Sequence, residues 1–294
     1  MTPPSVIAIF GPTASGKTAV AEAVADRLHG ELVSADAMQV YRGLPILTNQ
    51  PDRPTRLVGV WPLDHEASVA EYQELAHAAV DEAIAAGRPP IVVGGTGLYL
   101  RAALADIAFP PPPDPGAREH FERMYDRLGP ERSYALLSER DPAAAARVHA
   151  NDRRRVVRAL ELREAGESLA PGRDHLWADE MRYPTVVFGL DVPRDVLSAR
   201  IAERTRSMFE RGAQEEARRA LAGPISATAW HIMGLRELHG PARAKAIAAL
   251  EQRTRRYAAY QRKWMRRIPG LVSLDGTRPP AEIADEIATS VGRR

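Results

Sequence analysis

Short apolar runs alternate with longer amphipathic stretches along most of the chain. The runs have the length and composition of buried strands, and helix start and stop signals bound the stretches. Strands that alternate with helices are typical of parallel βαβ units, so the pattern predicts an α/β fold with a parallel sheet flanked by helices. Strands are predicted at residues 5–10, 30–36, 56–63, 91–94 and 185–190. Helices are predicted at 17–28, 69–86, from 97 onward, 117–166 and 193–267, with a short or frayed one at the end.

The pattern changes at a proline-dense stretch, residues 109–116. Proline lacks a backbone donor and fixes its φ angle, so this stretch neither continues a helix nor joins a central strand. The segment that follows is mostly helical until the apolar run at 185–190 returns to the sheet. We therefore expect a catalytic core made of residues 1–112 and 184–294, and a mostly helical insertion domain made of residues 113–183.

The segment "GPTASGKT" fits the phosphate-binding pattern G-x-x-x-x-G-K-[ST] between a predicted strand and a predicted helix. Its backbone N–H groups and the helix N-terminus suit a di- or triphosphate. Lys17 would reach the terminal phosphate, and the Thr18 hydroxyl would complete the shell of a bound Mg²⁺. The pattern predicts a P-loop NTPase-like sheet, with ATP or another phosphate ester as ligand.

Two further strand ends carry candidate chemistry. Asp36 closes the second predicted strand, where an acid can hold Mg²⁺ or take a proton from an acceptor, and where a helix N-cap is the alternative. The segment "IVVGGTG" places Thr96 at the end of another strand. Ligands of parallel sheets bind beyond the carboxyl ends of the strands, so Asp36, Thr96 and Gly11 should face one crevice.

Composition excludes several classes of protein. There are no cysteines, so disulfides, thiolate zinc sites and cysteine nucleophiles are absent. No run approaches the ~20 apolar residues of a membrane-spanning helix, and the first residues have no signal-peptide pattern. We expect a cytoplasmic, monomeric protein without membrane contact.

The net charge of +2 hides two basic clusters. The segment "NDRRRVVRALELR" places Arg154 and Arg158 on one helix face. The segment "TRRYAAYQRKWMRR", residues 254–267, has six basic residues and no acid, and its aromatic residues recur at helical spacing. Core packing is the favoured interpretation of that aromatic stripe. The basic faces are either solvated or contact the phosphate backbone of a nucleic acid.

Taken together, five fragments are similar in order and spacing to one family. The chain resembles the tRNA dimethylallyltransferases, the bacterial tRNA isopentenyltransferase family, from Val6 to about Arg267. The fragments are "GPTASGKT", "SADAMQVYRGL", "GGTGLYLRA", "NDRRRVVRALE" and "TRRYAAYQRKWMRR".

The resemblance implies a transfer reaction. Members of this family move a dimethylallyl group from dimethylallyl diphosphate to N6 of adenosine 37 in the anticodon loop of tRNA, and release diphosphate. By resemblance, Asp36 is the general base on a flipped-out adenine, and Thr96 and Arg204 complete the catalytic set, with Arg204 neutralising the departing diphosphate. The metal residue is Thr18, for Mg²⁺.

The same resemblance assigns the binding residues. The donor diphosphate is implied to bind Gly11, Pro12, Thr13, Ala14, Ser15, Gly16, Lys17 and Thr18. The tRNA is implied to contact Asp36, Ala37, Met38, Gln39, Thr96, Arg118, Arg154, Arg155, Val156, Val157 and Arg158.

The sequence departs from the family at two places. Gln50, in "LTNQP", stands where the family commonly has a lysine. The element "GLREL", from Gly234, replaces the common "GYxE". Neither departure lies in the phosphate loop or at Asp36.

Three alternatives share the phosphate loop. A P-loop kinase for a small metabolite or nucleotide would use Asp36 to activate a hydroxyl and the insertion as a lid. An isopentenyltransferase for free adenine nucleotides would not need the basic segments. A non-catalytic RNA-binding regulator would use the nucleotide as a switch and would tolerate loss of Asp36.

Overall fold

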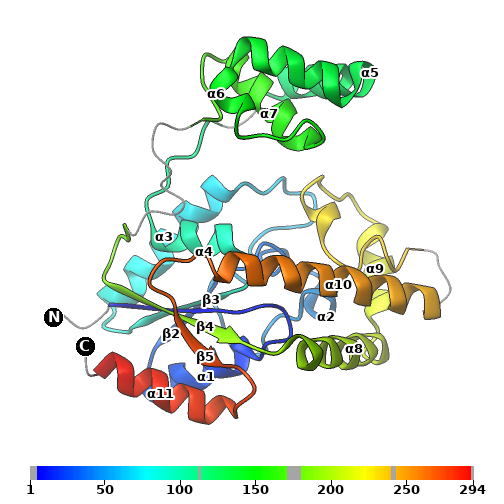
Figure 1. Cartoon of the computed structure of the whole chain (residues 1–294). Coiled ribbons are helices and arrows are strands. Elements are labelled where there is room, and N and C mark those ends of the chain that lie inside the picture. Colours follow the sequence, from blue (N-terminus) through cyan, green and yellow to red (C-terminus); the bar gives the residue numbers. More distant parts are fainter. Residues whose placement is uncertain (1–4, 112–113, 171–179, 240–242, 293–294) are drawn as a thin grey trace. The chain divides into compact units, whose positions relative to one another are not determined.

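The computed structural model, which describes residues 5–111, 114–170, 180–239 and 243–292, contains a parallel sheet of five strands. The strands are β1 (Val6–Phe10), β2 (Glu31–Ser34), β3 (Pro90–Gly94), β4 (Thr185–Asp191) and β5 (Val272–Asp275). Their order across the sheet is β2-β3-β1-β4-β5, and every neighbouring pair is parallel (Figure 1). The central strand β1 and its neighbour β3 are buried along their whole length, as expected for a sheet covered on both faces.

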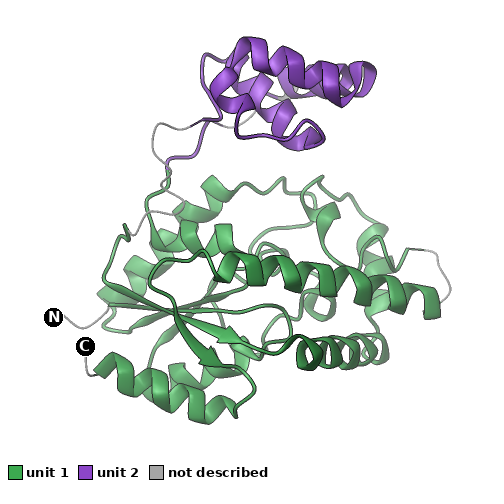
Figure 2. Cartoon of the chain, in the orientation of Figure 1, with its two compact units in different colours: residues 1–107, 176–294 green, residues 108–175 purple. Residues whose placement is uncertain are grey.

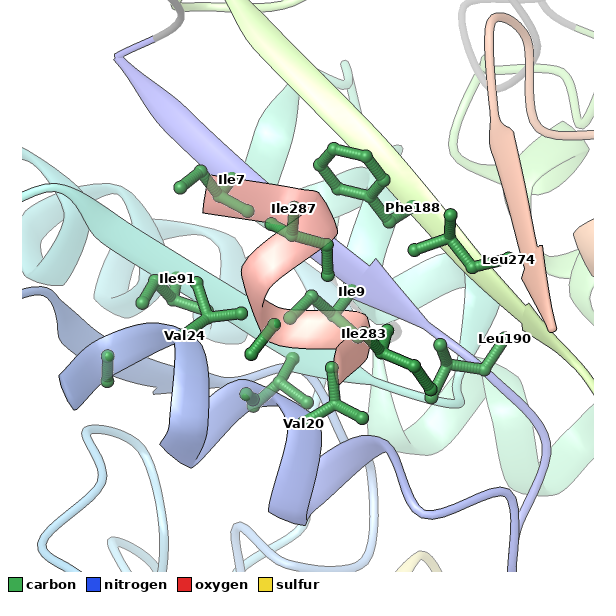
Figure 3. Packing of buried hydrophobic residues seen from close by; sticks show 14 of the residues in the cluster. Ile7, Ile9, Val20, Val24, Ile91, Phe188, Leu190, Leu274, Ile283 and Ile287 are labelled. Atoms are coloured by element: carbon green, nitrogen blue, oxygen red, sulfur yellow. The ribbon is translucent and has the colours of Figure 1, made fainter. Parts of the chain in front are cut away.

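Helices cover both faces of the sheet (Figure 1). On one face, α1 (Lys17–Leu28) and α11 (Pro280–Gly292) pack against side chains of the strands. Figure 3 shows Ile7 and Ile9 of β1 among residues from both helices, such as Val24 and Ile287. Burial of these side chains contributes about 25 cal/mol per Å² of apolar surface removed from water. This cluster anchors α1 to the sheet. It therefore also holds the phosphate loop in place, because α1 begins directly after that loop.

The opposite face carries α3 (Val69–Ala85), α4 (Gly97–Leu104) and α10 (Arg243–Met265). Ser68 caps α3 by accepting a hydrogen bond from the Glu71 backbone N–H. The remaining described helices of this part are α2 (Pro45–Thr48), α8 (Arg194–Glu210), α9 (Ala213–Leu221) and the 3₁₀ helix η1 (Ala229–His231).

Residues 108–175 form a second compact unit (Figure 2). Its helices are α5 (Pro115–Arg140), α6 (Pro142–Ala145) and α7 (Arg153–Glu164). They enclose their own apolar core, with Phe121, Leu137 and Leu160 fully buried. The predicted helical insertion is therefore a unit with a core of its own.

The two expected ends of the insertion, residues 113 and 183, differ in what the structure describes. Residue 113 lies outside the described residues, whereas residue 183 is described. Arg182 and Tyr183 belong to the core part because both donate to the Asp81 carboxylate on α3, at 3.0 and 2.9 Å. The hydrophobic pattern of the sequence does not predict such contacts between polar side chains and a helix of the core part.

The strand predicted at 56–63 is wrong. Arg56 and Trp61 make only isolated bridges to Val33 and Tyr41. Leu57 between them has a φ of 66°, a left-handed conformation that an extended strand cannot contain.

Two elements near the C-terminus also differ from the prediction. The strand β5 was not predicted, because only Leu274 of its four residues is buried and no apolar run marks it. The terminal helix is not short or frayed: α11 has 13 residues and buries Ile283, Ala284 and Ile287.

Among the described residues, no helix is long and apolar enough to cross a membrane.

Candidate active site

The register of the sheet brings three loops to one edge. Phe10 of β1 pairs with Gly94 of β3, and Ser34 of β2 pairs with Val93, so these strands end side by side. The phosphate loop, the Asp36 segment and the Thr96 segment follow them directly. The three loops therefore converge at the carboxyl ends of the strands, although of Gly11, Asp36 and Thr96 only Asp36 lines the cavity there.

A cavity of about 350 Å³ opens at this edge. The phosphate loop, α8 and α10 supply its polar walls, and its apolar surface includes Met38, Leu47 and Met233. Its lining residues are Thr13, Ala14, Gly16, Lys17, Thr18, Ala19, Asp36, Met38, Gln39, Leu47, Thr48, Asn49, Arg200, Arg204, Met233, Tyr257 and Gln261.

The phosphate loop has the conformation that its sequence predicts. Gly16 takes a left-handed φ of 89°, which a residue with a side chain rarely adopts, and α1 begins at the next residue. No side chain caps the N-terminus of α1, so its first N–H groups remain available to a ligand. Together with the positive end of the helix dipole, they form a site for phosphate oxygens.

Charges of both signs meet in the cavity. Burial lowers the pKa of the Lys17 ammonium to about 8, with nearby Arg204 acting in the same direction and Asp36 opposing it. Burial likewise lowers the pKa of the Arg204 guanidinium from its usual value. Placing two cations in a partly buried space is unfavourable, and a bound polyanion would offset that cost in free energy. The cavity is therefore built for an anion.

The helix α8 places two arginines on the phosphate loop. Arg204 Nη1 donates to Thr13 Oγ1 at 2.8 Å, and Arg200 Nη1 donates to the backbone oxygen of Ser15 at 3.3 Å and of Gly276 at 3.1 Å. Only Arg204 was expected from the sequence. The four-residue spacing of the two arginines, which puts them on one helix face, is the signal that could have identified Arg200.

The Asp36 segment is held by several hydrogen bonds. Asp36 Oδ1 accepts from the Met38 N–H at 2.9 Å, and no other hydrogen bond to this carboxylate occurs within the described ranges. The Ala37 N–H donates to Thr96 Oγ1 at 3.3 Å, and Gln39 bonds Ser34 Oγ at 2.9 Å. One carboxylate oxygen thus fixes the turn, and the other remains available for chemistry.

The helix α10 contributes two residues that the sequence interpretation did not place in a site. The Tyr257 hydroxyl lies 3.1 Å from Thr96 Oγ1, and Gln261 bonds the phosphate loop. The aromatic stripe of this helix is therefore not simply core, since Tyr257 lines the cavity and Tyr260 is 55% exposed. Burial is the main cause that raises the pKa of Tyr257 well above its usual value, so this hydroxyl stays protonated.

Comparison with known proteins identifies the family. A sequence profile described as "IPP transferase" matches residues 39–268. A tRNA dimethylallyltransferase of Myxococcus xanthus is 41% identical over 295 residues, which cover 96% of this chain and 94% of the relative. Another, of Salinispora arenicola, is 40% identical over 284 residues, covering 92% and 82% of the two chains. The chain belongs to the IPP transferase family.

This membership makes the chain a prenyltransferase and confirms the family inferred from the sequence fragments. It extends to the fold. The crystal structure of the full-length tRNA isopentenylpyrophosphate transferase from Bacillus halodurans matches with a TM-score of 0.70 at 32% identity, over 98% of this chain and 97% of that one. The P-loop-type parallel sheet is thus the fold of an IPP transferase.

The described residues of this IPP transferase contain no group of three or more histidine, cysteine or acidic side chains that could hold a metal ion by themselves. An Mg²⁺ ion does not need one, because it keeps water and phosphate oxygens as ligands. Thr18 and Asp36 line the same cavity and offer a hydroxyl and a carboxylate oxygen. This all-oxygen donor set fits the ion that the sequence predicts.

The second unit of the IPP transferase holds the other predicted RNA-binding residues. Arg154 and Arg155 are exposed at the start of α7. Arg118 Nε lies 3.6 Å from Glu122 Oε1, and Arg158 Nη1 donates to Glu161 Oε1 at 2.6 Å. These four guanidinium groups lie in one unit, which is separate from the unit of the cavity.

Two of the predicted RNA-binding residues are buried, unlike the arginines beside them. Val156 and Val157 are 0% and 2% exposed and pack in the core of the second unit. Their side chains stabilise α7 and cannot meet RNA. The helix α7 is amphipathic: its valines face the core of the unit, and its neighbouring arginines face solvent.

Gln50 and Gly234 mark the two departures from the family pattern. Gln50 Nε2 donates to the backbone oxygens of Tyr41 at 2.8 Å and of Gln39 at 3.3 Å, so it supports the segment after Asp36. The Gly234 N–H donates to the Glu237 carboxylate at 2.8 Å. Both residues have structural roles in this chain.

Proposed function

We propose that this enzyme transfers a dimethylallyl group from dimethylallyl diphosphate to N6 of adenosine 37 in tRNA and releases diphosphate. The observation that carries the proposal is that a phosphate-binding loop and an available carboxylate, Asp36, line one cavity. The relatives named tRNA dimethylallyltransferase support it, since a nearly full-length alignment relates them to this chain.

The donor would bind through its diphosphate. The N–H groups of the phosphate loop, Lys17 and Arg204 would surround a diphosphate bound at the start of α1. As the allylic C–O bond breaks, both of its electrons leave with the diphosphate, whose charge increases. Cations already fixed in place stabilise that charge without reorganising, which is the largest contribution in many such reactions.

Asp36 would act on the acceptor. The N6 amine of adenine is a weak nucleophile because its lone pair is delocalised into the ring. As the N6–carbon bond forms, the N6 proton passes to the carboxylate oxygen of Asp36 that makes no hydrogen bond. A positioned base of this kind contributes about 10²- to 10⁴-fold in rate. Thr96 would hold the neighbouring backbone through Ala37.

The acceptor base must leave its stack to reach a cavity. An adenine in an anticodon loop would be flipped out and held by the segment from Asp36 to Gln39. The exposed Arg154 and Arg155 of the second unit would bind the phosphate backbone of the same RNA.

Magnesium would bind next to the donor. The Thr18 hydroxyl would hold the ion, which would supply positive charge for the leaving diphosphate. The protein's own residues orient the donor, hold the acceptor and take its proton.

The test is a label-transfer experiment. The pure protein, Mg²⁺ and radiolabelled dimethylallyl diphosphate are incubated with unmodified tRNA carrying adenosine 37, or with a tRNA that has guanosine at that position. Parallel reactions contain free adenine nucleotides as acceptor, or ATP as donor. Label at N6 of adenosine 37, and none in the guanosine variant, is the expected result. Phosphate transfer from ATP to a small acceptor, with no label in RNA, would support the kinase instead. Label in free adenine nucleotides alone would support the nucleotide-specific enzyme.

A further inference from the structure

Gln261 of α10 joins two loops of the cavity through one side chain. Its Oε1 accepts from the Thr13 N–H of the phosphate loop at 2.8 Å, and its Nε2 donates to the Gly95 backbone oxygen at 2.8 Å. The side chain is 2% exposed, so water does not compete for either bond. A neutral amide is suited to this place because it offers a donor and an acceptor at once.

Tyr257 lies four residues earlier on the same face of α10. Its hydroxyl is 3.1 Å from Thr96 Oγ1, which in turn accepts from the Ala37 N–H at 3.3 Å. Ala37 follows the proposed base, Asp36. Two side chains on one face of α10 therefore bond the phosphate loop and, through Thr96, the residue beside the base.

The approach of α10 to these loops is fixed by packing. A Cβ at Gly95 would lie 2.4 Å from Gln261 Nε2, so a residue with a side chain at this position would displace the Gln261 amide. The helix α10 also packs Ala258 against Leu197 and Ile201 of α8. A helix held between α8 and the loops has a defined position from which to set the loops.

We infer that Gln261 and Tyr257 are positioning residues, which set the distance between the donor phosphates and Asp36. The inference rests on the proposed function and adds the element that aligns the two substrates. Bond formation needs reacting atoms about 3–3.5 Å apart, and a displacement of ~1 Å can lower the rate about 100-fold. Loss of either residue should therefore lower kcat more than it changes KM for either substrate.

A double-mutant cycle tests the role of Tyr257. The variants are Tyr257→Phe, Thr96→Val and the double variant, and each change removes a hydroxyl while it keeps most of the packing. If Tyr257 acts through Thr96, each single variant lowers kcat and the double variant is no slower than Thr96→Val. Independent packing roles would instead make the two losses multiply, and this result would overturn the inference.

Hydrogen exchange tests the role of Gln261 without reference to transfer. Gln261→Leu should speed amide exchange at Thr13, because that N–H loses its acceptor. Gln252→Leu, at an exposed position of the same helix, is the control and should leave exchange at Thr13 unchanged. Unchanged exchange at Thr13 in Gln261→Leu would overturn the inference even if the wild type transfers label. Wild-type label transfer, measured in parallel, reports separately on the proposed function.

Discussion

Arg204 on α8 donates a hydrogen bond from Nη1 to the Thr13 hydroxyl in the phosphate loop, 2.8 Å away. The two residues lie far apart in the sequence, and their contact brings a guanidinium to the place where a leaving diphosphate would develop charge. The loop alone would supply N–H groups and one lysine. The helix α8 adds two arginines to the positive charge at the loop.

Arg204→Ala should lower kcat about 10²- to 10³-fold, because a preorganised group that stabilises developing charge is lost. Steady-state transfer of label to tRNA measures this change. Arg206→Ala on the same helix is the matched control, because Arg206 is 61% exposed and pairs with Glu203. Equal activity of the Arg204 variant and the control would remove Arg204 from the mechanism.

Lys17 should make donor binding depend on pH. Its pKa is lowered to about 8, so the free enzyme loses this positive charge as the pH rises through that value. The affinity for dimethylallyl diphosphate should therefore fall above about pH 8, and titration calorimetry from pH 7 to 9.5 can measure it. In Lys17→Met the affinity should be weak at every pH, without this inflection. An inflection that persists in Lys17→Met would assign it to another group.

The same pKa has a consequence for stability, with the opposite sign. Between about pH 8 and the ordinary lysine pKa of 10.5, an unfolded chain keeps the Lys17 proton that the folded enzyme has lost. The unfolded state then binds more protons, so the free energy of unfolding contributed by this group rises with pH. Urea unfolding should show this rise in the wild type relative to Lys17→Met, and an equal pH dependence of the two would contradict it.

Glu216 should stabilise the wall of the cavity. Its carboxylate, 2% exposed, accepts from the N–H groups of Ile46 and Leu47 at 2.9 and 2.7 Å, at the start of α2. Glu216→Ala leaves two buried donors without acceptors, which should lower the free energy of unfolding by about 1–3 kcal/mol. Urea unfolding measures this, with Glu215→Ala as the exposed control. Equal stability of the two variants would contradict the role of this cap.

The arginines of α7 should set the salt dependence of RNA binding. Arg154 and Arg155 are exposed, and neither forms an ion pair among the described residues. Replacing both with alanine should weaken tRNA binding and reduce the slope of log K against log salt by about two. Filter binding at several salt concentrations measures the slope. Arg123→Ala, whose partner is Glu119, should change it less, and an unchanged slope in the double variant would exclude this face.

Much of this architecture could be predicted because local patterns determine it. The phosphate loop, Asp36 and Thr96 each directly follow an apolar run, and parallel strands bring such positions together at one edge. The contact of Arg182 with Asp81 on α3 could not be predicted in this way, because it joins side chains that lie far apart in the sequence. The strand predicted at 56–63 failed because Leu57 and Gly59 both have positive φ angles, and Gly59 was the turn signal in the sequence.

The missed site residues have a common physical cause. Tyr257, Gln261 and Arg200 lie on long helices whose other residues are ordinary core and surface positions. Their function depends on which helix face meets the phosphate loop, and that is decided by tertiary packing. Val156 and Val157 show the converse, since they adjoin exposed arginines in sequence but face the core.

The central claim is that Asp36 takes the proton from N6 of the acceptor adenine. The most direct measurement is the single-turnover rate of label transfer by Asp36→Asn, with donor and tRNA both saturating. Asparagine keeps the size and the oxygen that accepts from Met38, but it cannot take a proton. The rate should fall about 10²- to 10⁴-fold while the dissociation constants of both substrates stay near those of the wild type. A variant that transfers label at the wild-type rate would show that Asp36 is not the base.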